Sequence, residues 1–397
     1  MSYNYHTRNV LTELYNLKGL AQKFLSERGP GRPPDLGYIK RFADYINAGD
    51  EMTGCLLFAA GEIARDLALT ALYFALTDIN VLFEQSDASA GVMQVLALFA
   101  AADIVIKKHR ARGVPEKIIR DTFGDLKVWI ENYSAENDGA IGVNIYRIWM
   151  HHHYTENLFR VGRLQYLLNP YRGYARLFID DATGEMIMTA QAGIAFRGDG
   201  LVDGQNDIFS PETRWESESR EDENEVRTNC LFVNGRAIRT PVLIDKKKYR
   251  IALEKGIYGL EMHIPRGEGL THENCVESLF GARDFFMKLR PEQPFETYYC
   301  GSWLLDRNVQ DFLPPSSGIV QFQKLYRLYP IPGNEWSFLD RGFGVRDPDE
   351  TLKDLIMFAR KADRSTALRR GVADYILAGG RLHSGAGIIH LNDVLRM

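Results

Sequence analysis

The sequence predicts an α+β protein, in which an all-helical N-terminal domain precedes a mixed β-sheet domain with flanking helices. Two observations support this prediction. Up to about residue 155, apolar residues recur three or four positions apart, which is the period of a helix with one buried face. Beyond that point, short apolar runs alternate with turn signals, which is typical of strands. We therefore expect a helical domain over residues 1–155 and a second domain over residues 156–397.

The helical pattern of the first domain is clearest after Gly113, which ends one predicted helix. Pro115 follows at a position where a first-turn proline is tolerated. Residues 51–79 are similarly helical and apolar, whereas GRPPDL, residues 31–36, predicts a loop. An apolar stripe at helical spacing is expected to be buried and consists of Ile119, Phe123, Leu126, Ile130 and Tyr133.

The second domain begins with two predicted hairpins. The tetrapeptide DATG, residues 181–184, and the dipeptide NG, residues 234–235, each lie between two strand-like runs. Asn-Gly is a strong hairpin signal because both residues tolerate the positive φ of a type I′ turn. The acidic run between the hairpins, ESESREDENEVR at residues 216–227, predicts a solvated loop or linker.

A strand, a glycine-rich turn, a helix and another strand are expected next. Residues 256–265 predict the first strand, and the helix is expected to have Thr271 as its N-cap and Pro291 just beyond its last turn. The stretch FETYYCGSWLLD, residues 295–306, predicts the second strand. Its last residue, Asp306, is expected to end the strand and to cap the helical turn that follows.

The end of the chain alternates once more between the two periods. Residues 318–330, GIVQFQKLYRLYP, predict a strand. Two helical patterns follow, at residues 352–361 and 366–377.

Composition excludes several functional classes. The 397 residues are 45% hydrophobic and 25% charged with a net charge of −4, which is typical neither of a disordered chain nor of a nucleic-acid-binding protein. The four cysteines form no CxxC pair. The polar N-terminus lacks a signal peptide, and the most apolar segment, residues 92–106, is too short for a membrane span and predicts a buried helix. We expect a cytoplasmic protein that binds neither nucleic acid nor membrane.

The turn HIPRGEGLT, residues 263–271, is a candidate phosphate site. A helix N-terminus presents unpaired N–H groups and the positive end of its dipole. Gly267 and Gly269 would let the backbone approach a pyrophosphate, and Arg266 would add positive charge. The spacing fits neither a P-loop nor GxGxxG, and the alternative is a plain turn between strand and helix.

Several stretches spread over nearly the whole chain form a pattern that occurs in a known family. They are DTFGDLKVWI (121–130), NLFRVGRLQY (157–166), MHIPRG (262–267), VESLFGARDFF (276–286), CGSWLLD (300–306), LPPSSGIVQF (313–322) and STALRRGVADYILAGG (365–380). Together they resemble the two-domain bacterial GNAT-like acyltransferase family, which joins a helical acyltransferase N-terminal domain to a GNAT-like C-terminal domain. Two positions depart from the family pattern. Gly301 stands where a second serine usually follows the cysteine, and Gly318 stands where asparagine usually follows serine.

The resemblance implies a sheet in which two central parallel strands part to admit an acyl-CoA. GLEMHIP, residues 259–265, would be the first of these strands, and residues 295–305 the second. Acetyl-CoA or another acyl-CoA would be the co-substrate, and no metal is expected. Arg266, Gly269 and Thr271 partly match the Arg/Gln-x-x-Gly-x-Gly/Ala spacing of the superfamily. The expected CoA-binding residues are Ile264, Arg266, Gly267, Gly269, Leu270 and Thr271.

The chemistry that the resemblance implies is attack of an amine on a thioester. It requires a base for the ammonium proton, a donor for the leaving thiolate and N–H groups for the oxyanion. His263 is the expected base; alternatively, it orients the turn by bonding to backbone. Cys300 and Ser302 lie two apart on one strand face, and one of them is expected to bond or protonate the thiolate. The alternative is that both are small packing residues.

Other constellations predict less specific chemistry. Ser302, His263 and Asp306 resemble a hydrolase triad in composition, but no Gly-x-Ser-x-Gly elbow surrounds the serine. Residues 151–153, three histidines, point in different directions on a helix and are expected to be partly exposed. Trp303 is expected in the core.

Two classes of function follow. The first is an N-acyltransferase acting on the amine of a small-molecule or peptide acceptor. The second is an inactive GNAT-like binding or scaffolding protein, which Glu268 would favour if its side chain filled the phosphate cradle. A third possibility is that the helical half recognises a carrier or peptide.

Overall fold

The computed structural model describes residues 7–84, 91–143, 147–345 and 347–396, without the side chains of Arg8, Arg147 and Ile148. The chain divides into two compact units, Met1–Gln165 and Tyr166–Met397. The first six residues, part of the stretch expected not to be a signal peptide, lie outside the described residues.

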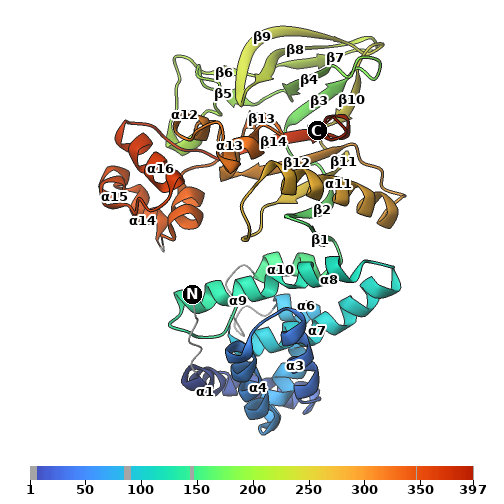
Figure 1. Cartoon of the computed structure of the whole chain (residues 1–397), viewed down its shortest axis with the longest axis vertical. Coiled ribbons are helices and arrows are strands. Elements are labelled where there is room, and N and C mark those ends of the chain that lie inside the picture. The colour runs from blue at the N-terminus through green and yellow to red at the C-terminus, as the bar shows by residue number, and fades with distance from the viewer. Residues whose placement is uncertain (1–6, 85–90, 144–146, 346, 397) are drawn as a thin grey trace. The chain divides into compact units, whose positions relative to one another are not determined.

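The first unit is built from helices (Figure 1). In the described residues they are α1 (Thr7–Asn16), α2 (Lys18–Arg28), α3 (Leu36–Tyr45), α4 (Asp50–Ala64), α5 (Leu67–Leu76), α6 (Ile79–Glu84), α7 (Val92–Ala111), α8 (Glu116–Phe123), α9 (Asp125–Glu136) and α10 (Arg147–Tyr154).

Helix α7 is the centre of this unit, because it contacts α3, α4, α5 and α8. Its residues from Val95 to Phe99 are all fully buried, which confirms the prediction of a buried helix. Among the described residues, no helix combines the length and the apolar character needed to cross a membrane. The predicted loop at residues 31–36 is confirmed, since Asp35 caps α3 by accepting a hydrogen bond from the Tyr38 N–H at 2.9 Å.

The predicted apolar stripe spans two helices, because α8 and α9 meet at Gly124. Four of its five members are buried, and Tyr133 is partly exposed. Strand β1 (Leu158–Val161) ends the unit and packs on α8, where the Arg160 N–H donates to Thr122 Oγ1 at 2.9 Å.

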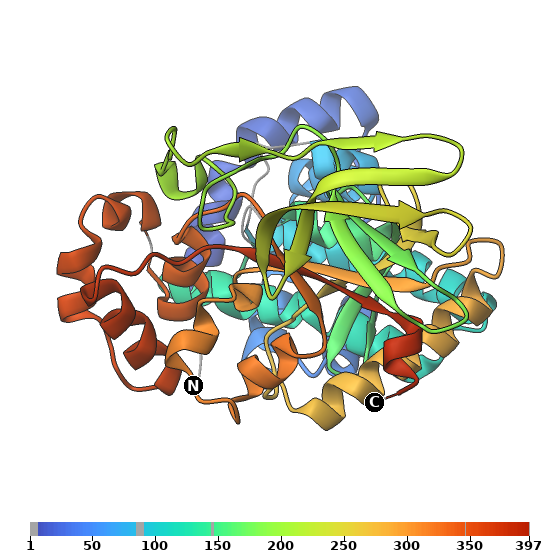
Figure 2. The ribbon, with the colours of Figure 1, turned by 90° about the horizontal axis from the view of Figure 1, so that it is seen from above.

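In the described residues, the second unit contains two large sheets, which Figures 1 and 2 show in two views, and a small two-stranded one. Within this unit, the first sheet has the order β2 (Leu164–Pro170), β11 (Tyr258–His263), β12 (Thr297–Ser302), β14 (Gly385–His390) and β13 (Arg327–Pro330). In it, β11 and β12 are parallel, whereas β14 is antiparallel to both β12 and β13. The second sheet has the order β10 (Arg250–Leu253), β3 (Ala175–Ile179), β4 (Met186–Ala190), β8 (Glu225–Val233) and β7 (Ser219–Glu221), with β9 (Arg236–Asp245) also on β8.

A shared apolar core joins the two sheets. It includes Phe196 and Phe232 from the second-sheet side and Tyr299 and Ile388 from the first sheet. Helix α11 (His272–Leu289) packs on the first sheet, where the Tyr298 hydroxyl of β12 donates to the Leu279 carbonyl at 2.8 Å. Each strand of the β11–β12 pair therefore has one side toward the inter-sheet core and one toward α11.

Both predicted hairpins are confirmed. Strands β3 and β4 pair up to Ile179 and Met186 around the DATG turn. Strands β8 and β9 pair up to Val233 and Arg236, and the turn residues Asn234 and Gly235 have φ values of 48° and 79°.

The prediction of a loop for the acidic run was wrong. Residues 216–227 contain the end of β6 (Trp215–Glu216), which pairs with β5 (Ala195–Phe196), then β7 and the start of β8. Arg220 of β7 faces Arg227 of β8 in an antiparallel ladder. Charged side chains are compatible with a solvent-facing hairpin, and Val226, the one large apolar residue of the run, is fully buried.

The prediction of one strand over residues 318–330 was also wrong. The segment is helix α13 (Gly318–Gln323) followed by β13, because Ser317 caps the helix by accepting from the Val320 N–H at 3.2 Å. Strand β14 had no counterpart in the sequence prediction, and its six residues Gly385–His390 are all buried.

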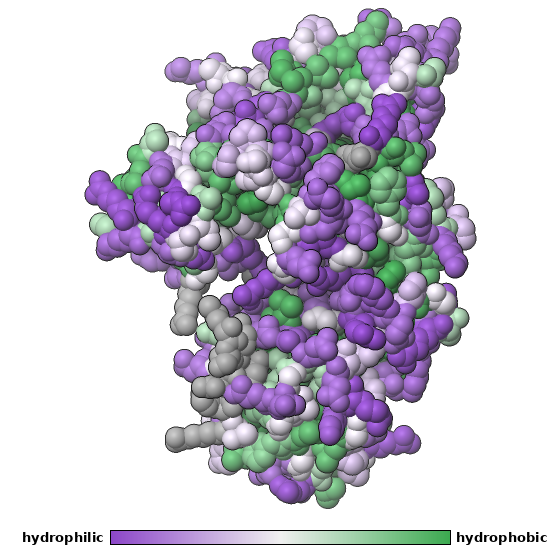
Figure 3. Space-filling model, in the orientation of Figure 1, coloured by the Kyte–Doolittle hydropathy of each residue, from purple (hydrophilic) through white to green (hydrophobic). Residues whose placement is uncertain are grey.

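The predicted C-terminal helices are confirmed and lie between β13 and β14 in the chain. They are α14 (Pro348–Leu352), α15 (Leu355–Lys361) and α16 (Ala367–Leu377), preceded by the π-helical turn Phe338–Phe343. Helices α15 and α16 share a core with α12 (Val309–Phe312) and α13, against which Trp303 packs as expected. In the view of Figure 3, mostly hydrophilic residues cover the outer side of these helices.

Candidate functional site

The parallel strands β11 and β12 pair over a short stretch and then part. Their ladder joins Leu260 to Tyr298 and Glu261 to Tyr299, and in the described residues it does not continue to Met262 or His263. On its other side, β12 pairs with β14 along its full length, through Ser302. The carboxyl end of β12 is therefore held in the sheet on one side only, and we call the unpaired stretch between the ends of the two strands the opening.

One side of this opening, which we call the carboxylate face, consists of Glu261, His263, Tyr299 and Asn169. Glu261 and His263 lie two apart on β11, so their side chains share a face. Glu261 Oε1 lies 3.3 Å from His263 Nε2, and both side chains are about one-third exposed, at 33% and 31%. Glu261 Oε2 accepts from the Asn169 amide at 3.1 Å and from the Tyr299 hydroxyl at 3.4 Å.

The other side, which we call the sulfur face, consists of Met262, Cys300 and Tyr326. The Tyr326 hydroxyl contacts the Cys300 thiol and lies 3.9 Å from Met262 Sδ. Cys300 is only 2% exposed, and burial raises the pKa of its thiol to about 12. Gly387 faces Cys300 across the β12–β14 ladder and makes room for Tyr326, because a Cβ on Gly387 would lie 2.6 Å from Tyr326 Cβ.

The three predicted catalytic residues do not share one face. His263 is on the carboxylate face, whereas Cys300 and Ser302 lie on the opposite side of the sheet. Ser302 Oγ accepts from the Leu304 N–H at 3.2 Å and so caps the turn after β12. Glu261 was missed by sequence reasoning, although its position two residues before His263 in a predicted strand was a usable signal.

The structure contains no arrangement of Ser302, His263 and Asp306 as a triad. The Asp306 carboxylate accepts from the backbone N–H groups of Asn308 at 2.9 Å and His383 at 2.8 Å. Burial raises the pKa of Asp306 to about 7. The prediction that Asp306 ends the strand was wrong, because β12 ends at Ser302 and the 3₁₀ turn Trp303–Leu305 follows it. Asp306 does hold the turn that comes next, through the Asn308 N–H.

The loop between β11 and α11 is open to solvent at the predicted phosphate site. Residues 266–269 are exposed, Ile264 is partly buried and Leu270 is 9% exposed. A Cβ placed on Gly269 would meet no atom within 4 Å. Thr271 is the N-cap of α11, as predicted, and accepts from the Asn274 N–H at 3.2 Å. The Asn274 amide in turn donates to the Gly269 carbonyl at 2.7 Å and ties the loop to the helix.

Two glutamates bear on whether this helix end accepts an anion. Glu268, whose side chain would have to fill the cradle to block it, is exposed. Glu273 was not considered from the sequence. Its carboxylate bonds to its own backbone N–H and to the Thr271 hydroxyl, which lowers its pKa. It is therefore the negative group that a phosphate would meet at the first turn of α11.

Gly318 supports the same loop from α13. A Cβ at this position would lie 2.5 Å from the Leu270 carbonyl oxygen, so only glycine permits this approach. The departure from the family pattern at Gly318 thus has a packing reason. The departure at Gly301 differs, because a Cβ there would make an ordinary contact of 3.5 Å with Ile331.

The three histidines of α10 do not all behave as predicted. His153 is buried, with its Nε2 atom 3.3 Å from Asp125 Oδ2, whereas residues 151 and 152 are partly exposed. The same oxygen of Asp125 accepts from the indoles of Trp129 and Trp149, each at 3.1 Å. Within the described residues, no group of three or more His, Cys, Asp and Glu side chains is placed to share a metal ion.

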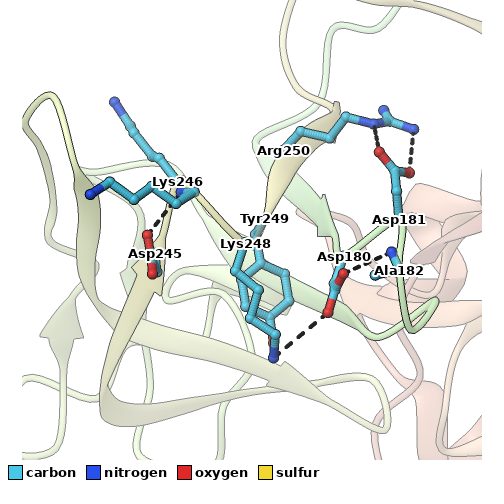
Figure 4. A pocket seen from close by; sticks show the side chains of 9 residues that line it. Asp180, Asp181, Ala182, Asp245, Lys246, Lys248, Tyr249 and Arg250 are labelled. Atoms are coloured by element: carbon cyan, nitrogen blue, oxygen red, sulfur yellow. Dashed lines mark hydrogen bonds and ion pairs between the residues drawn. The ribbon is translucent and has the colours of Figure 1, made fainter.

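A surface hollow of about 530 Å³ lies elsewhere in the second unit (Figure 4). Its basic side chains are partly neutralised, since Arg250 bonds to Asp181 at 2.6 and 2.9 Å and Lys248 lies 3.8 Å from Asp180. Arg250 also donates to Glu296, just before β12 begins, at 2.7 Å. The hollow is thus near the amino end of β12, whereas the strands part at its carboxyl end.

Comparison with known proteins identifies two families of domains. Residues 39–155 match the N-acyltransferase N-terminal domain, and residues 158–389 match the GNAT-like C-terminal domain. A search of curated proteins gives no match.

Among solved structures, an acyltransferase in complex with CoA and 10C-teicoplanin matches with a TM-score of 0.57 at 17% identity. An acyltransferase in complex with decanoyl-CoA and teicoplanin matches with a TM-score of 0.57 at 18% identity. Both alignments cover 97% of this chain and 99% of the other, so the likeness of fold extends over both domains.

Proposed function

Because the chain belongs to the family that joins an N-acyltransferase N-terminal domain to a GNAT-like C-terminal domain, we propose that it transfers an acyl group from a CoA thioester to an amine. The observation that supports this most is the parting of β11 and β12 immediately before the loop that leads into α11. The opening would receive the thioester, and the loop would receive the pyrophosphate.

The loop suits a pyrophosphate in three respects. It precedes an 18-residue helix whose first N–H groups lack intrahelical partners. Arg266 is exposed beside it, and the exposed Gly269 leaves space for close approach. We assign CoA binding to Ile264, Arg266, Gly267, Gly269, Leu270 and Thr271, with acetyl-CoA or a longer acyl-CoA as co-substrate.

In the proposed reaction, the acceptor nitrogen attacks the thioester carbonyl carbon. The new C–N bond forms, the C–S bond breaks, and His263 takes the proton that the nitrogen loses. Backbone N–H groups at the unpaired edge of β12 would hold the oxyanion. Ser302 Oγ accepts the capping hydrogen bond, and we assign its hydroxyl a hydrogen bond to the leaving thiolate, which takes its proton from solvent. Cys300, with its raised pKa and burial, has a packing role in this scheme.

For the acceptor, we propose a small-molecule amine, with a peptide amine as the other candidate. The two similar structures were solved with teicoplanin or 10C-teicoplanin, and this supports an acceptor that is not a macromolecule. We place the reaction in the cytoplasm, where CoA thioesters are available.

The test is calorimetric titration of the full chain with CoA, acetyl-CoA and decanoyl-CoA, followed by a screen of amines that monitors release of free thiol. Saturable binding that weakens in Arg266→Glu, together with amine-dependent thiol release, is expected. Binding of CoA without release for any amine would support a scaffolding role instead. Absence of binding to all three ligands would overturn the proposal.

A further inference from the structure

We propose that Glu261 is a positioning residue that orients the ring of His263 and fixes which ring nitrogen carries the proton, and that Asn169 and Tyr299 hold the Glu261 carboxylate in place. The inference rests on the proposed role of His263 as the base. Neither Glu261 nor its two neighbours belongs to the set of residues that the sequence predicted for the site.

The Glu261 carboxylate is held by strands on both sides of its own. Asn169 belongs to β2 and Tyr299 to β12, and β11 lies between these strands in the sheet. Both side chains donate to the same oxygen, Oε2, at 3.1 and 3.4 Å. Burial and the nearby carboxylate raise the pKa of Tyr299, so its hydroxyl keeps the proton that it donates. These two donors fix the carboxylate plane and direct Oε1 toward His263.

The contact with His263 is long, since Nε2 lies 3.3 Å from Oε1. Catalytic hydrogen bonds are often long without substrate and tighten when it binds. A hydrogen bond from the Nε2 N–H to the carboxylate would fix the orientation of the ring and the nitrogen that carries its proton.

The position of this network argues against a role in stability alone. Partly exposed ion pairs contribute little to stability, and both side chains are about one-third exposed, at 33% and 31%. Glu261 and Tyr299 form the last pair of the ladder before the strands part. The network therefore ends at the opening in which the thioester is proposed to lie.

The test measures the coupling without requiring an acceptor. Imidazole ¹⁵N signals of the full-length protein, which has nine histidines, are recorded by NMR, and His263→Ala identifies the signals of His263. In Glu261→Gln, we expect the ¹⁵N signals of Nε2 and Nδ1 of His263 to move toward each other, because the carboxylate no longer favours the proton on Nε2. Asn169→Ala and Tyr299→Phe should give smaller changes in the same direction. Tyr298→Phe is the matched control, because the Tyr298 hydroxyl bonds to Leu279 on the other side of β12.

Turnover, once an acceptor is found, gives a second readout. Glu261→Gln should lower kcat by about 10- to 100-fold with little change in KM. Glu261→Asp should not restore the rate, since its shorter side chain does not reach both partners. Unchanged ¹⁵N signals of His263 in Glu261→Gln would overturn the inference even if acyl transfer is observed. Changed signals in a protein without turnover would support the network and contradict the proposed function.

Discussion

The two faces of the parting strands differ in what they can contribute to chemistry. On the carboxylate face, His263 and Glu261 are partly exposed and lie within 3.3 Å of each other. On the sulfur face, Cys300 is 2% exposed, and burial holds its thiol pKa at about 12. Successive side chains of a strand lie on opposite faces. Met262 therefore packs on the sulfur face, whereas the next residue, His263, lies on the carboxylate face.

This difference shows that the residue type predicts function less well than the strand face on which a side chain lies and its burial. A thiol is intrinsically the better nucleophile, but only as a thiolate, and an apolar environment disfavours that form. His263 has a different environment, since its side chain is about one-third exposed, at 31%, and lies beside a carboxylate. The sequence-based grouping of His263 with Cys300 and Ser302 joined residues that the sheet separates.

The largest effect is expected when the proposed general base of the carboxylate face is removed. His263→Ala should lower turnover by about 10²- to 10⁴-fold, which is the usual contribution of a general base. Affinity for acyl-CoA should stay unchanged, because the expected phosphate contacts begin at Arg266. Steady-state kinetics and calorimetry on the same preparation separate the two quantities. Unchanged turnover would remove His263 from the mechanism.

A second prediction concerns the charges around the first turn of α11. Arg266→Glu should weaken CoA binding by about tenfold, since an exposed attraction becomes a repulsion. Glu273→Gln should tighten it by about two- to fivefold, because it removes a negative charge from the helix N-terminus. Glu268→Gln is the matched control and should change affinity least. Calorimetric titration with CoA at low and high salt measures all three, and equal responses of the two glutamates would contradict the assignment of the cradle.

Much of the fold could be predicted because local signals agreed with tertiary structure. In each case one local feature determines the structure. Thr271 caps a helix, the Asn-Gly turn requires positive φ values, and the α7 segment is buried along most of its length. The predictions of secondary structure were wrong where the local sequence pattern and the tertiary structure disagree. Gly318–Pro330 is divided between helix and strand because Ser317 supplies a cap, although the apolar pattern alone favours a strand. Strand β14 is buried along its whole length and therefore shows no alternation of apolar and polar residues.

The site was predictable in its parts but not in its grouping. The motif around His263 indicated the strand end, the glycine turn and the helix cap correctly. Tyr299 and Asn169 were out of reach, since their relation to Glu261 depends on the order β2-β11-β12 in the sheet. Non-local pairing of this kind leaves no trace in the spacing of residues along the chain.

A third prediction tests the two glycines that depart from the family pattern. Gly318→Ala should destabilise the protein by about 1–3 kcal/mol, because its Cβ would lie 2.5 Å from the Leu270 carbonyl oxygen and force the backbone apart. The displaced loop should also bind CoA more weakly. Gly301→Ala is the control, since its Cβ would meet Ile331 at 3.5 Å, an ordinary contact. Thermal unfolding with and without CoA measures both, and equal losses in the two variants would contradict the packing argument.

The smallest effect on turnover is expected from the sulfur face. Cys300→Ala should change turnover by no more than about threefold, since a buried thiol with a pKa of about 12 holds almost no thiolate near pH 8. Iodoacetamide labelling checks the premise: all four cysteines are buried, so the native protein should label slowly at this pH. Gly301→Cys supplies the contrast, because position 301 is exposed and points to the opposite face from Cys300. The introduced thiol should label rapidly and be protected by acyl-CoA. Two outcomes would contradict the contrast between the faces. They are labelling of Cys300 at the rate of the introduced thiol and a large loss of turnover in Cys300→Ala. Either would show that substrate reaches the sulfur face.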